Sequence, residues 1–356
     1  MTKWSADQPN NSLAGLPPQR LSLTVQQNAS LLEVVNLLAR LDEAAALLGN
    51  PAVFNNAMPM LEVSSSSRIE NIITTHDEMF VADASTTQPM TADTRMAMKS
   101  RAALNLGFEA MSKRPITVKL LGQIASELLG YEVSIRHLPG TFIGHVGKRV
   151  YTPPEGKELI QKLVSELVDF IGSSELHPVL VMILAHYQFE AIHPYPDGNG
   201  RTGRVLNHLI LNQGGLLQSP VLNLSTYLVR NRNEYYERIH GVEALGDWSS
   251  WIDFMLGAMK AATLDSYTKL KELTLKQLEF SEKLYESIGK QAPDLAQLLF
   301  EKPYCQIGHV VQRLGISRPT ASKFLETLVR AELLTSFVSG KEKFFVNKTM
   351  LEVLAR

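Results

Sequence analysis

Cysteine, net charge and long apolar runs are all scarce in this chain, and each scarcity excludes a class of protein. The 356 residues include a single cysteine, Cys305, which excludes an internal disulfide and indicates a reducing compartment. The formal net charge of −1 gives no overall attraction to nucleic acid or to an anionic membrane. No apolar run approaches the ~20 residues that span a bilayer, and residues 1–12 lack the apolar part of a signal peptide. We therefore expect a cytoplasmic protein without a membrane partner.

The composition that remains is that of a soluble globular protein with several hydrophobic cores. Apolar residues make up 45% of the chain and charged residues 20%, and the length suits two or three domains. Apolar residues recur at helical spacing along most of the chain, so the predicted fold class is mainly α. The first 20 residues are predicted to run extended over a surface. We predict a helical N-terminal region, a central core, a helical linker and a small α+β domain, which span residues 1–105, 106–265, 266–291 and 292–356.

Residues 186–204 contain the highest concentration of side chains that could take part in catalysis or ligand binding. Apolar residues precede it at 179–184 and follow it at helical spacing over 205–211, which predicts a helix, a tight loop and a second helix. Three helix-breaking residues end the first helix directly after His193, namely Pro194, Pro196 and Gly198. The second helix is predicted to begin near Asn199.

The start of this second helix has the parts of a phosphate-binding site. Its unpaired N–H groups and positive dipole end face the loop, and small residues let a phosphate approach the backbone. Arg201 and Arg204 add two guanidinium groups, which match phosphate oxygens in geometry. Asp197 offers a carboxylate to a hard cation such as Mg²⁺, and His193 can take a proton near neutral pH. Together these residues predict a site that moves a phosphate-containing group.

Each part also has an ordinary structural explanation. An Asp-Gly-Asn-Gly turn is common, a lone histidine at a helix end is often a cap, and two arginines three apart usually face solvent. The convergence of all of them between His193 and Arg204 is what favours a functional site. A nucleotide-binding P-loop is the natural alternative, but the chain contains no G-x-x-x-x-G-K-[ST] sequence.

From His193 to Arg204 the sequence resembles the signature of the Fic family, with Tyr195 where that family usually has phenylalanine. The resemblance implies that residues 106–265 form a Fic core, which transfers AMP from ATP to a Ser, Thr or Tyr hydroxyl of a target protein and of itself. It makes His193 the general base and Asp197 the Mg²⁺ ligand. It assigns the phosphates of ATP to the rest of the signature, namely Gly198, Asn199, Gly200, Arg201 and Arg204.

A second motif, upstream of the signature, bears on control of the site. Ser66 and Glu70 lie one helical turn apart near the end of a helix predicted at about 59–72, and a solvent-exposed glutamate is the simplest interpretation. The segment Ser66-x-x-x-Glu70-Asn71 resembles the inhibitory motif of the Fic family. By that likeness Glu70 pairs with Arg204 and keeps it from the γ-phosphate, whereas Arg201 serves catalysis alone.

Two further regions are expected to contact the substrates. Glycines and β-branched residues over 137–152 predict a hairpin whose free edge accepts an added strand. Such a hairpin can be merely structural, but its position resembles the Fic flap, which holds the target polypeptide beside the catalytic histidine. The resemblance also brings Tyr227 or Asn231 to the adenine, while Tyr235 and Tyr236 are expected in the hydrophobic core.

The spacing of apolar residues over 292–356 resembles that of a winged helix-turn-helix, with a recognition helix at 317–330. The segment has nine Lys and Arg against six Asp and Glu, a modest surplus for a DNA-binding module. Four side chains are candidates for phosphate contact: Arg318, Lys323, Lys341 and Lys343. DNA and protein remain equal candidates as the partner of this module, and the choice between a monomer and a homodimer stays open.

Protein adenylyltransferase activity, held off by Glu70, is the function that the sequence predicts. A phosphotransferring branch of the family carries lysine where this chain has Gly200, so Gly200 favours nucleotidyl transfer. Two alternatives remain: removal of AMP with Glu70 positioning a water molecule, and a DNA-binding regulator in which the Fic core is secondary.

Overall fold

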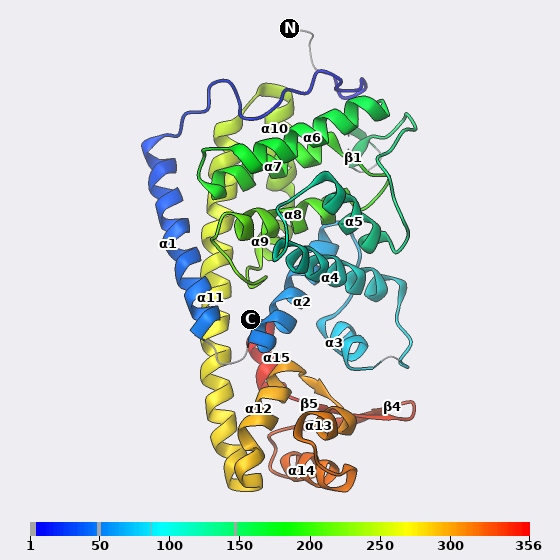
Figure 1. The fold of residues 1–356 in the computed structure, drawn as a ribbon, viewed down its shortest axis with the longest axis vertical. Helices are drawn as coiled ribbons and strands as arrows, with labels where there is room; N and C mark the ends of the chain where they lie inside the picture. Colours follow the sequence, from blue (N-terminus) through cyan, green and yellow to red (C-terminus); the bar gives the residue numbers. More distant parts are fainter. Residues whose placement is uncertain (1–4, 48–50, 86, 146–147) are drawn as a thin grey trace.

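In the computed structural model, which describes residues 5–47, 51–85, 87–145 and 148–356, most residues lie in helices (Figure 1). The described strands form two small antiparallel sheets, one of two strands and one of three. The mainly α fold class predicted from the sequence is therefore confirmed.

Two helices at the centre of the larger part of the molecule carry the predicted signature. α7 (Pro178–Ile192) is buried along its whole length from Val179 onward, because neighbouring elements cover every side of it. α8 (Asn199–Gln213) follows after a short loop and packs against α7. Around this pair lie α4 (Ala92–Met111), α5 (Val118–Leu129), α6 (Lys157–Ser173), α9 (Leu224–Arg230) and α10 (Arg232–Leu245).

A single long helix, α11 (Trp248–Ile288), runs beside both the core and the C-terminal part of the chain (Figure 1). Its 41 residues give a length of about 60 Å at the usual helical rise. α1 (Val25–Leu47) packs along it, and the Gln27 amide donates to the Ser249 carbonyl at 3.1 Å. The predicted boundary between core and linker, at 265/266, falls inside this continuous helix.

α2 (Pro51–Ile69) is the helix that carries the predicted inhibitory motif. It begins earlier than the predicted 59–72, and Pro59 lies inside it instead of at its start. The four serines 64–67 are all buried, because their small side chains let neighbouring helices approach closely. Glu62 is buried as well and ties α2 to α9, since its Oε2 accepts the backbone N–H of Ser225 at 2.9 Å. Glu70 follows directly after the last residue of the helix.

The predicted hairpin is present between α5 and α6. β1 (Ile143–His145) and β2 (Lys148–Tyr151) pair antiparallel, with His145 opposite Lys148. These strands lie within the predicted flap at 137–152, and residues 146–147 fall outside the described residues.

The C-terminal part has the α+β arrangement that was predicted for it. Three helices, α12 (Ala292–Glu301), α13 (Ile307–Leu314) and α14 (Arg318–Arg330), precede the hairpin of β4 (Thr335–Ser339) and β5 (Glu342–Val346). β3 (Tyr304–Cys305) joins β5 to complete a three-stranded sheet of order β3-β5-β4, and α15 (Lys348–Ala355) ends the chain. α12 packs on both α2 and α11.

The N-terminal region also contacts the hairpin of this C-terminal part. α3 (His76–Ala84) lies beside it, and the Phe80 ring stacks on Tyr304 with centroids 6.3 Å apart. Gln88 donates to the Ser339 carbonyl at 2.9 Å and to Glu342 at 2.8 Å. The β4–β5 hairpin is thus bound to another part of the same chain.

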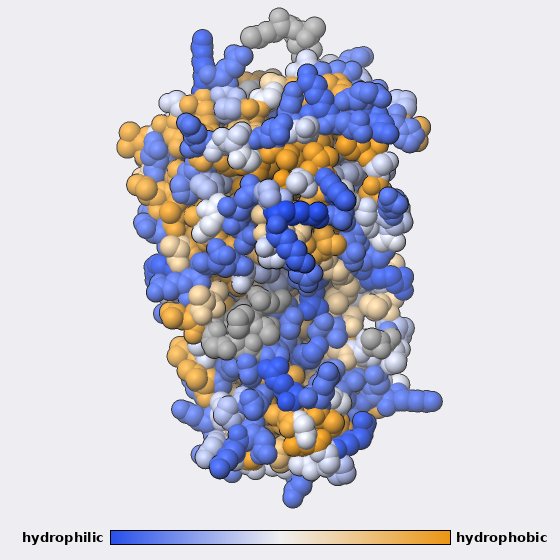
Figure 2. Space-filling view, viewed as in Figure 1, coloured by the Kyte–Doolittle hydropathy of each residue, from blue (hydrophilic) through white to orange (hydrophobic). Residues whose placement is uncertain are grey.

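The surface shown in Figure 2 mixes the two kinds of side chain. Hydrophilic residues are spread over the whole length of this face, with smaller hydrophobic areas between them. No helix among the described residues is both long enough and apolar enough to cross a membrane.

Candidate active site

His193 lies where α7 ends, and the local backbone directs its side chain into a cavity. Its φ of 50° and ψ of 58° are left-handed, a conformation that a residue with a side chain adopts only where its surroundings enforce it. The His193 N–H donates to the Phe189 carbonyl at 3.0 Å and closes the helix, and Pro194 prevents its continuation. The helix end thus sets the position of the imidazole.

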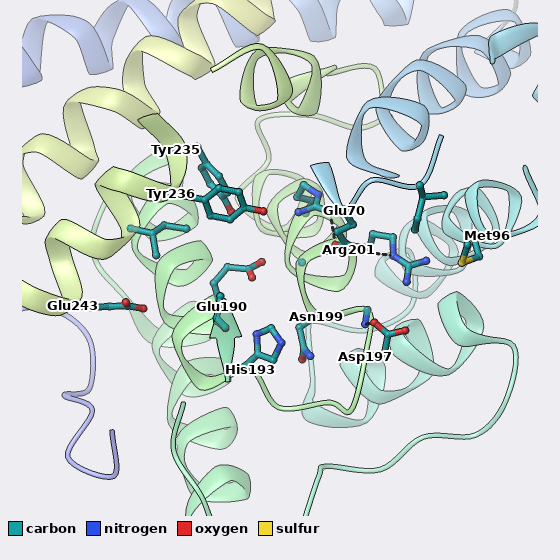
Figure 3. Close-up of a pocket in the computed structure, with 16 residues that line it drawn as sticks. Glu70, Met96, Glu190, His193, Asp197, Asn199, Arg201, Tyr235, Tyr236 and Glu243 are labelled. Atoms are coloured by element: carbon teal, nitrogen blue, oxygen red, sulfur yellow. Dashed lines mark hydrogen bonds and ion pairs between the residues drawn. The ribbon is translucent and has the colours of Figure 1, made fainter. Parts of the chain in front are cut away.

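The cavity in front of His193 has a volume of about 430 Å³ and contains most of the predicted site (Figure 3). Its lining joins α7, the loop, α8, α10, the flap and the residue that follows α2. The predicted residues on this lining are Glu70, His193, Asp197, Gly198, Asn199, Gly200, Arg201 and Arg204. The fold therefore brings Glu70 to the signature residues, although Glu70 and Arg204 are 134 residues apart in the sequence.

Asn199 holds the loop between the two helices in shape. Its side-chain oxygen accepts the N–H of Tyr195 at 2.8 Å, and its amide donates to the Tyr195 carbonyl at 2.7 Å. Both ends of the side chain are thus engaged within the loop. The side chain thus positions the loop, and the backbone of Asn199 lies at the start of α8. The predicted contact of Asn199 with phosphate stays a prediction.

Two glycines of the loop and helix start are needed for distinct reasons. Gly198 has a φ of 72°, which favours glycine. At Gly200 a Cβ atom would lie 2.6 Å from the Glu70 Oε1 atom and 2.9 Å from the Arg204 Nη1 atom. A side chain at residue 200 would therefore displace the carboxylate and fill the space beside the arginines.

Asp197 provides one carboxylate at the mouth of this helix start. It is exposed, and its Oδ1 atom accepts the Gly198 N–H at 2.6 Å. The described residues include no group of three or more metal-ligating side chains. A single carboxylate beside a phosphate cradle suits Mg²⁺, which takes most of its ligands from substrate phosphates and water.

Glu70 forms ion pairs with both arginines of the signature. Its Oε2 accepts from Arg201 Nε at 2.8 Å, and its Oε1 accepts from Arg204 Nη2 at 2.7 Å. The predicted pairing with Arg204 is present, but the expectation that Arg201 stands apart from Glu70 is wrong. One carboxylate reaches both guanidinium groups because they lie three residues apart, on neighbouring positions of one helix face.

Ser66 holds Arg204 in this arrangement. Arg204 Nε donates to the Ser66 hydroxyl at 2.7 Å, and Arg204 Nη2 donates to the Ser66 carbonyl at 3.0 Å. Burial alone would lower the pKa of Arg204, but the Glu70 carboxylate opposes it and the pKa is raised. Arg201 keeps its Nη1 atom buried without a hydrogen-bond partner among the described residues, so one donor is left for an anion.

The imidazole of His193 is neutral over the physiological range. Burial, and then the positive charge of Arg136, lower its pKa to about 4 against smaller opposing effects of Glu70 and Asp197. A neutral imidazole can accept a proton, so His193 is in the state that a general base requires.

Arg136 was not identified from the sequence, although it supports the loop that begins at His193. Its Nε atom donates to the His193 carbonyl at 2.7 Å, and its Nη2 atom donates to Pro154 at 2.5 Å. Its backbone N–H donates to the Pro194 carbonyl at 2.9 Å. A lone arginine ahead of a hairpin carries no sequence signal for this role, because its partners are backbone carbonyls of another segment.

Glu190 is a second residue that was missed. It lines the cavity three residues before His193, and its Oε1 atom is buried without a hydrogen-bond partner among the described residues. Burial first, and then the charge of Glu70, raise its pKa to about 7, while Arg204 lowers it. The i, i+3 spacing from His193 on a helix was the available signal.

The far end of the cavity is lined by residues other than those predicted for the adenine. Tyr227 packs against Phe254, and the Asn231 side chain donates to the Tyr227 carbonyl at 3.0 Å, so neither lines the cavity. Tyr235 is buried as expected, but it and Tyr236 both line the cavity. The remaining residues of this end are Ile143, Ile239 and Glu243. Hydrogen bonds within the α9–α10 turn, which the sequence does not reveal, turn Asn231 away.

The fold places this site in a known class of helical proteins. A solved structure of a Fic family protein from Desulfovibrio desulfuricans G20 matches with a TM-score of 0.60 at 21% identity, over 93% of this chain and 98% of that one. A Fic-1 structure from Caenorhabditis elegans matches with a TM-score of 0.55 at 19% identity, over 69% of this chain and 74% of that one. These identities establish a shared fold alone.

Three family models then match in order along the chain. They are Fic/DOC family N-terminal at residues 31–109, Fic/DOC family at 115–211, and the C-terminal domain described as protein adenylyltransferase SoFic-like at 282–350. The chain belongs to the Fic/DOC family, as its signature predicted.

Curated relatives match over part of their length. The protein adenylyltransferase fic-1 of Caenorhabditis elegans is 30% identical over 148 residues, which cover 37% of this chain and 27% of the relative. The protein adenylyltransferase Fic of Drosophila yakuba is 29% identical over 197 residues, covering 52% and 37%. A probable protein adenylyltransferase of Aquifex aeolicus is 31% identical over 147 residues, covering 39% and 43%. The chain thus matches less than half of the length of each of these relatives.

Proposed function

We propose that this protein transfers AMP from ATP to a hydroxyl of a target protein and of itself, and that Glu70 inhibits the reaction. The observation that carries the proposal is the double ion pair of Glu70 with Arg201 and Arg204, in one cavity with a neutral His193. The names of the curated relatives support the same activity.

The lining of the cavity suggests how ATP lies in it. The helix start, Arg201 and Arg204 take the β- and γ-phosphates, since they supply the N–H groups and positive charge. His193 then lies beside the α-phosphate, and the nucleoside extends away from the arginines. The base reaches the end lined by Ile143, Tyr236 and Glu243.

Glu243 is the polar residue that can read the base at that end. Its side chain is 3% exposed, and burial raises the pKa of its carboxyl group. A carboxyl group has an oxygen that accepts a hydrogen bond from an amino group, whether it is ionised or protonated. The 6-amino group of adenine is such a donor, so Glu243 favours ATP over a nucleotide that lacks it.

The chemistry follows from the position of His193. The target hydroxyl attacks the α-phosphorus as His193 removes its proton, the bond from the α-phosphorus to the β-phosphate oxygen breaks, and pyrophosphate leaves. Arg201 and Arg204 stabilise the negative charge that grows on the leaving group. Mg²⁺ held by Asp197 would neutralise charge on the phosphates when it is bound.

The target is proposed to dock along the flap. The β1–β2 hairpin is two-stranded, and β1 carries Ile143 into the cavity that contains His193. An extended segment that adds to a sheet edge is held by main-chain hydrogen bonds. A target strand on this hairpin would bring its hydroxyl to His193.

Inhibition follows from the competition between Glu70 and the phosphates of ATP for the same guanidinium groups. While Glu70 is bound to both arginines, its carboxylate offsets part of their positive charge and occupies Arg201 Nε and Arg204 Nη2. ATP then lacks the contacts that hold its β- and γ-phosphates in line with the attacking hydroxyl. Release of Glu70 restores both contacts at once.

A labelling experiment tests the proposed activity. The Glu70→Gly variant is incubated with Mg²⁺ and ATP that carries the label on the α- or on the γ-phosphate. AMP transfer leaves label on the protein from α-labelled ATP alone, and Glu70→Gly/His193→Ala leaves none. Label retained from the γ-phosphate would instead indicate phosphoryl transfer. Loss of AMP from a modified protein with wild type, and no labelling of Glu70→Gly, would support AMP removal by Glu70.

A further inference from the structure

An N-terminal segment, Ser5–Ala14, lies along the base of the flap, and we call it the strap. The strap belongs to the extended segment at the N-terminal end of Figure 1. The Asn10 N–H donates to the Thr152 carbonyl at 3.0 Å, and the Thr152 hydroxyl donates to the Ala6 carbonyl at 2.6 Å. Thr152 directly follows β2. Because its carbonyl and its hydroxyl both bond to the strap, the strap fixes the end of that strand.

One side chain of the strap connects it to the helix that carries the catalytic histidine. The Asn10 amide donates to the Tyr151 hydroxyl at 3.3 Å, and this hydroxyl donates to the Ala191 carbonyl at 3.1 Å. Ala191 lies two residues before His193. Burial raises the pKa of Tyr151, so its hydroxyl keeps the proton that it donates. A chain of hydrogen bonds therefore runs from the strap through the flap to α7.

The strap also reaches the other leg of the flap. The Asn11 side-chain oxygen accepts the Glu155 N–H at 2.8 Å. The Glu155 carboxylate in turn accepts the Gly140 N–H at 2.9 Å. Gly140 precedes β1 and Glu155 follows β2, so these two bonds hold the legs of the hairpin at a fixed separation.

Polar bonds of this kind hold the strap, because a cavity separates much of it from the core. The cavity has a volume of about 740 Å³ and lies between the strap, α7 and α10. Gln188 crosses to the strap and donates to the Ala14 carbonyl at 2.9 Å. Removal of a strap side chain therefore loses bonds to the flap while it leaves the packing of α7 and α8 in place.

We propose that the strap positions the flap for modification of the target, with Asn10 as the positioning residue. The flap carries Ile143 into the nucleotide cavity and presents its edge beside His193. A flap released from the strap samples more positions, so a target strand on it less often brings a hydroxyl to the catalytic base. The catalytic half of this proposal rests on the proposed AMP transfer, whereas the structural half does not.

Hydrogen exchange tests the structural half in the full-length protein. Asn10→Ala and a deletion of residues 2–14 are compared with wild type. Loss of one or two hydrogen bonds predicts amide exchange about tenfold faster in 143–145 and 148–151, with α7 and α8 unchanged. Gln8→Ala is the matched control in the strap, since its exposed side chain takes no part in the bonds described above. Unchanged exchange in the flap of both strap variants would overturn the proposal.

Transfer of label tests the catalytic half in the Glu70→Gly background. Asn10→Ala is expected to lower the rate of self-labelling from α-labelled ATP about tenfold, with the KM for ATP changed less than about twofold. A change in the KM for ATP alone, or an unchanged rate with a faster-exchanging flap, would overturn the role in modification. If Glu70→Gly itself transfers no AMP, the proposed function fails, and hydrogen exchange still decides whether the strap positions the flap.

A double-mutant cycle separates the hydrogen-bond chain from general loosening. Tyr151→Phe removes the hydroxyl that joins Asn10 to Ala191. The effects of Asn10→Ala and Tyr151→Phe on exchange and on rate should then be smaller together than their sum. Fully additive effects would show that Asn10 does not act through Tyr151, which would contradict the assigned positioning role.

Discussion

At the scale of single residues, the site depends on four side chains whose states are set by burial and by neighbouring charges. Glu70 joins Arg201 and Arg204, and its carboxylate lowers the cost of burying the two arginines by offsetting part of their charge. His193 stays neutral because it is buried beside a cation. The resting protein thus has a base that is ready and a phosphate site that is occupied by its own carboxylate.

The low pKa of His193 predicts the pH dependence of the uninhibited enzyme. A general base is active when deprotonated, so activity is lost as the pH falls through the pKa of His193, which is lowered to about 4. In Glu70→Gly the loss of the nearby carboxylate lowers this pKa further. As far as His193 determines it, the single-turnover rate should therefore be level from about pH 5.5 to pH 8. A histidine with the ordinary pKa of about 6.5 would instead make the rate fall below that pH. A fall in the single-turnover rate centred near pH 6.5, without a matching change in the affinity for ATP, would contradict this account.

The position of Glu243 predicts which nucleobase the enzyme prefers. If the Glu243 carboxylate accepts a hydrogen bond from the 6-amino group of adenine, Glu70→Gly should use ATP in preference to inosine triphosphate. Inosine triphosphate has a carbonyl in place of the 6-amino group. Glu243→Leu should reduce the ratio of the two kcat/KM values by about 10–100-fold, because the polar partner is gone. Tyr227→Phe is the control, since Tyr227 lies outside the cavity. An unchanged ratio in Glu243→Leu would place the base elsewhere.

At the scale of elements, α2 is held to the core at several points along its length. Glu62 binds Ser225 near its middle, the Ser65 hydroxyl lies 2.8 Å from that of Thr226, and Ser66 holds Arg204 near its end. Glu70 is presented to the arginines only while this helix stays in place. The proposed inhibitory contact therefore depends on residues that lie outside the nucleotide cavity.

Glu62 provides the test of that dependence. Its pKa is lowered, since bonds from His208 and Ser225 outweigh the opposing effect of burial. The carboxylate stabilises the fold above its unfolded-state pKa, and this stability is lost as the pH falls through the lower folded-state value. Glu62→Ala should lower the free energy of unfolding by about 3–5 kcal/mol in chemical denaturation and raise self-labelling above wild type.

A matched surface variant shows whether that effect is specific to α2. Glu33 on α1 pairs with Lys260 at 2.5 Å, with both side chains about half exposed. Glu33→Ala should therefore cost less than about 1 kcal/mol and leave self-labelling unchanged. Equal losses of stability in the two variants, or Glu62→Ala labelling no faster than wild type, would refute the anchoring role of Glu62.

At the scale of the whole molecule, the C-terminal part is bound to the N-terminal region that carries the proposed inhibitory residue Glu70. α12 packs on α2, Tyr304 stacks on Phe80, and Glu342 in the β4–β5 hairpin accepts bonds from Ser85 and Gln88. Lys343, a candidate for phosphate contact, pairs with Glu326 at 2.6 Å. The side of the hairpin that meets Gln88 is therefore occupied within the chain, and we propose a protein-binding or structural role for it instead of DNA binding.

The DNA-binding alternative is tested with the full-length protein. Random and selected duplexes should show no sequence-selective, salt-dependent retention at low salt, because the β4–β5 hairpin is bound to the N-terminal region. Arg318→Ala and Lys323→Ala should leave any weak binding unchanged in sequence preference. Selective retention that these substitutions remove would establish the regulator interpretation instead.

The sequence predicted most of this architecture, and its failures have physical causes. The signature and the inhibitory motif are local, so His193, Asp197 and Glu70 could be named from the chain alone. Periodicity predicted the helices, but α11 continues through the expected linker because tertiary packing on α1 and α12 overrides weak local signals. The supporting role of Arg136 and the turn that removes Asn231 depend on backbone partners, which no side-chain pattern encodes.

The central claim is that Glu70 holds the enzyme inactive through both arginines. The most direct measurement is the rate of AMP incorporation from α-labelled ATP into wild type and Glu70→Gly at equal concentrations of protein and Mg²⁺. Release of two charge-assisted bonds predicts a rate about 10²–10⁴-fold higher in Glu70→Gly. Equal rates in the two proteins, or a higher rate in wild type, would contradict the claim.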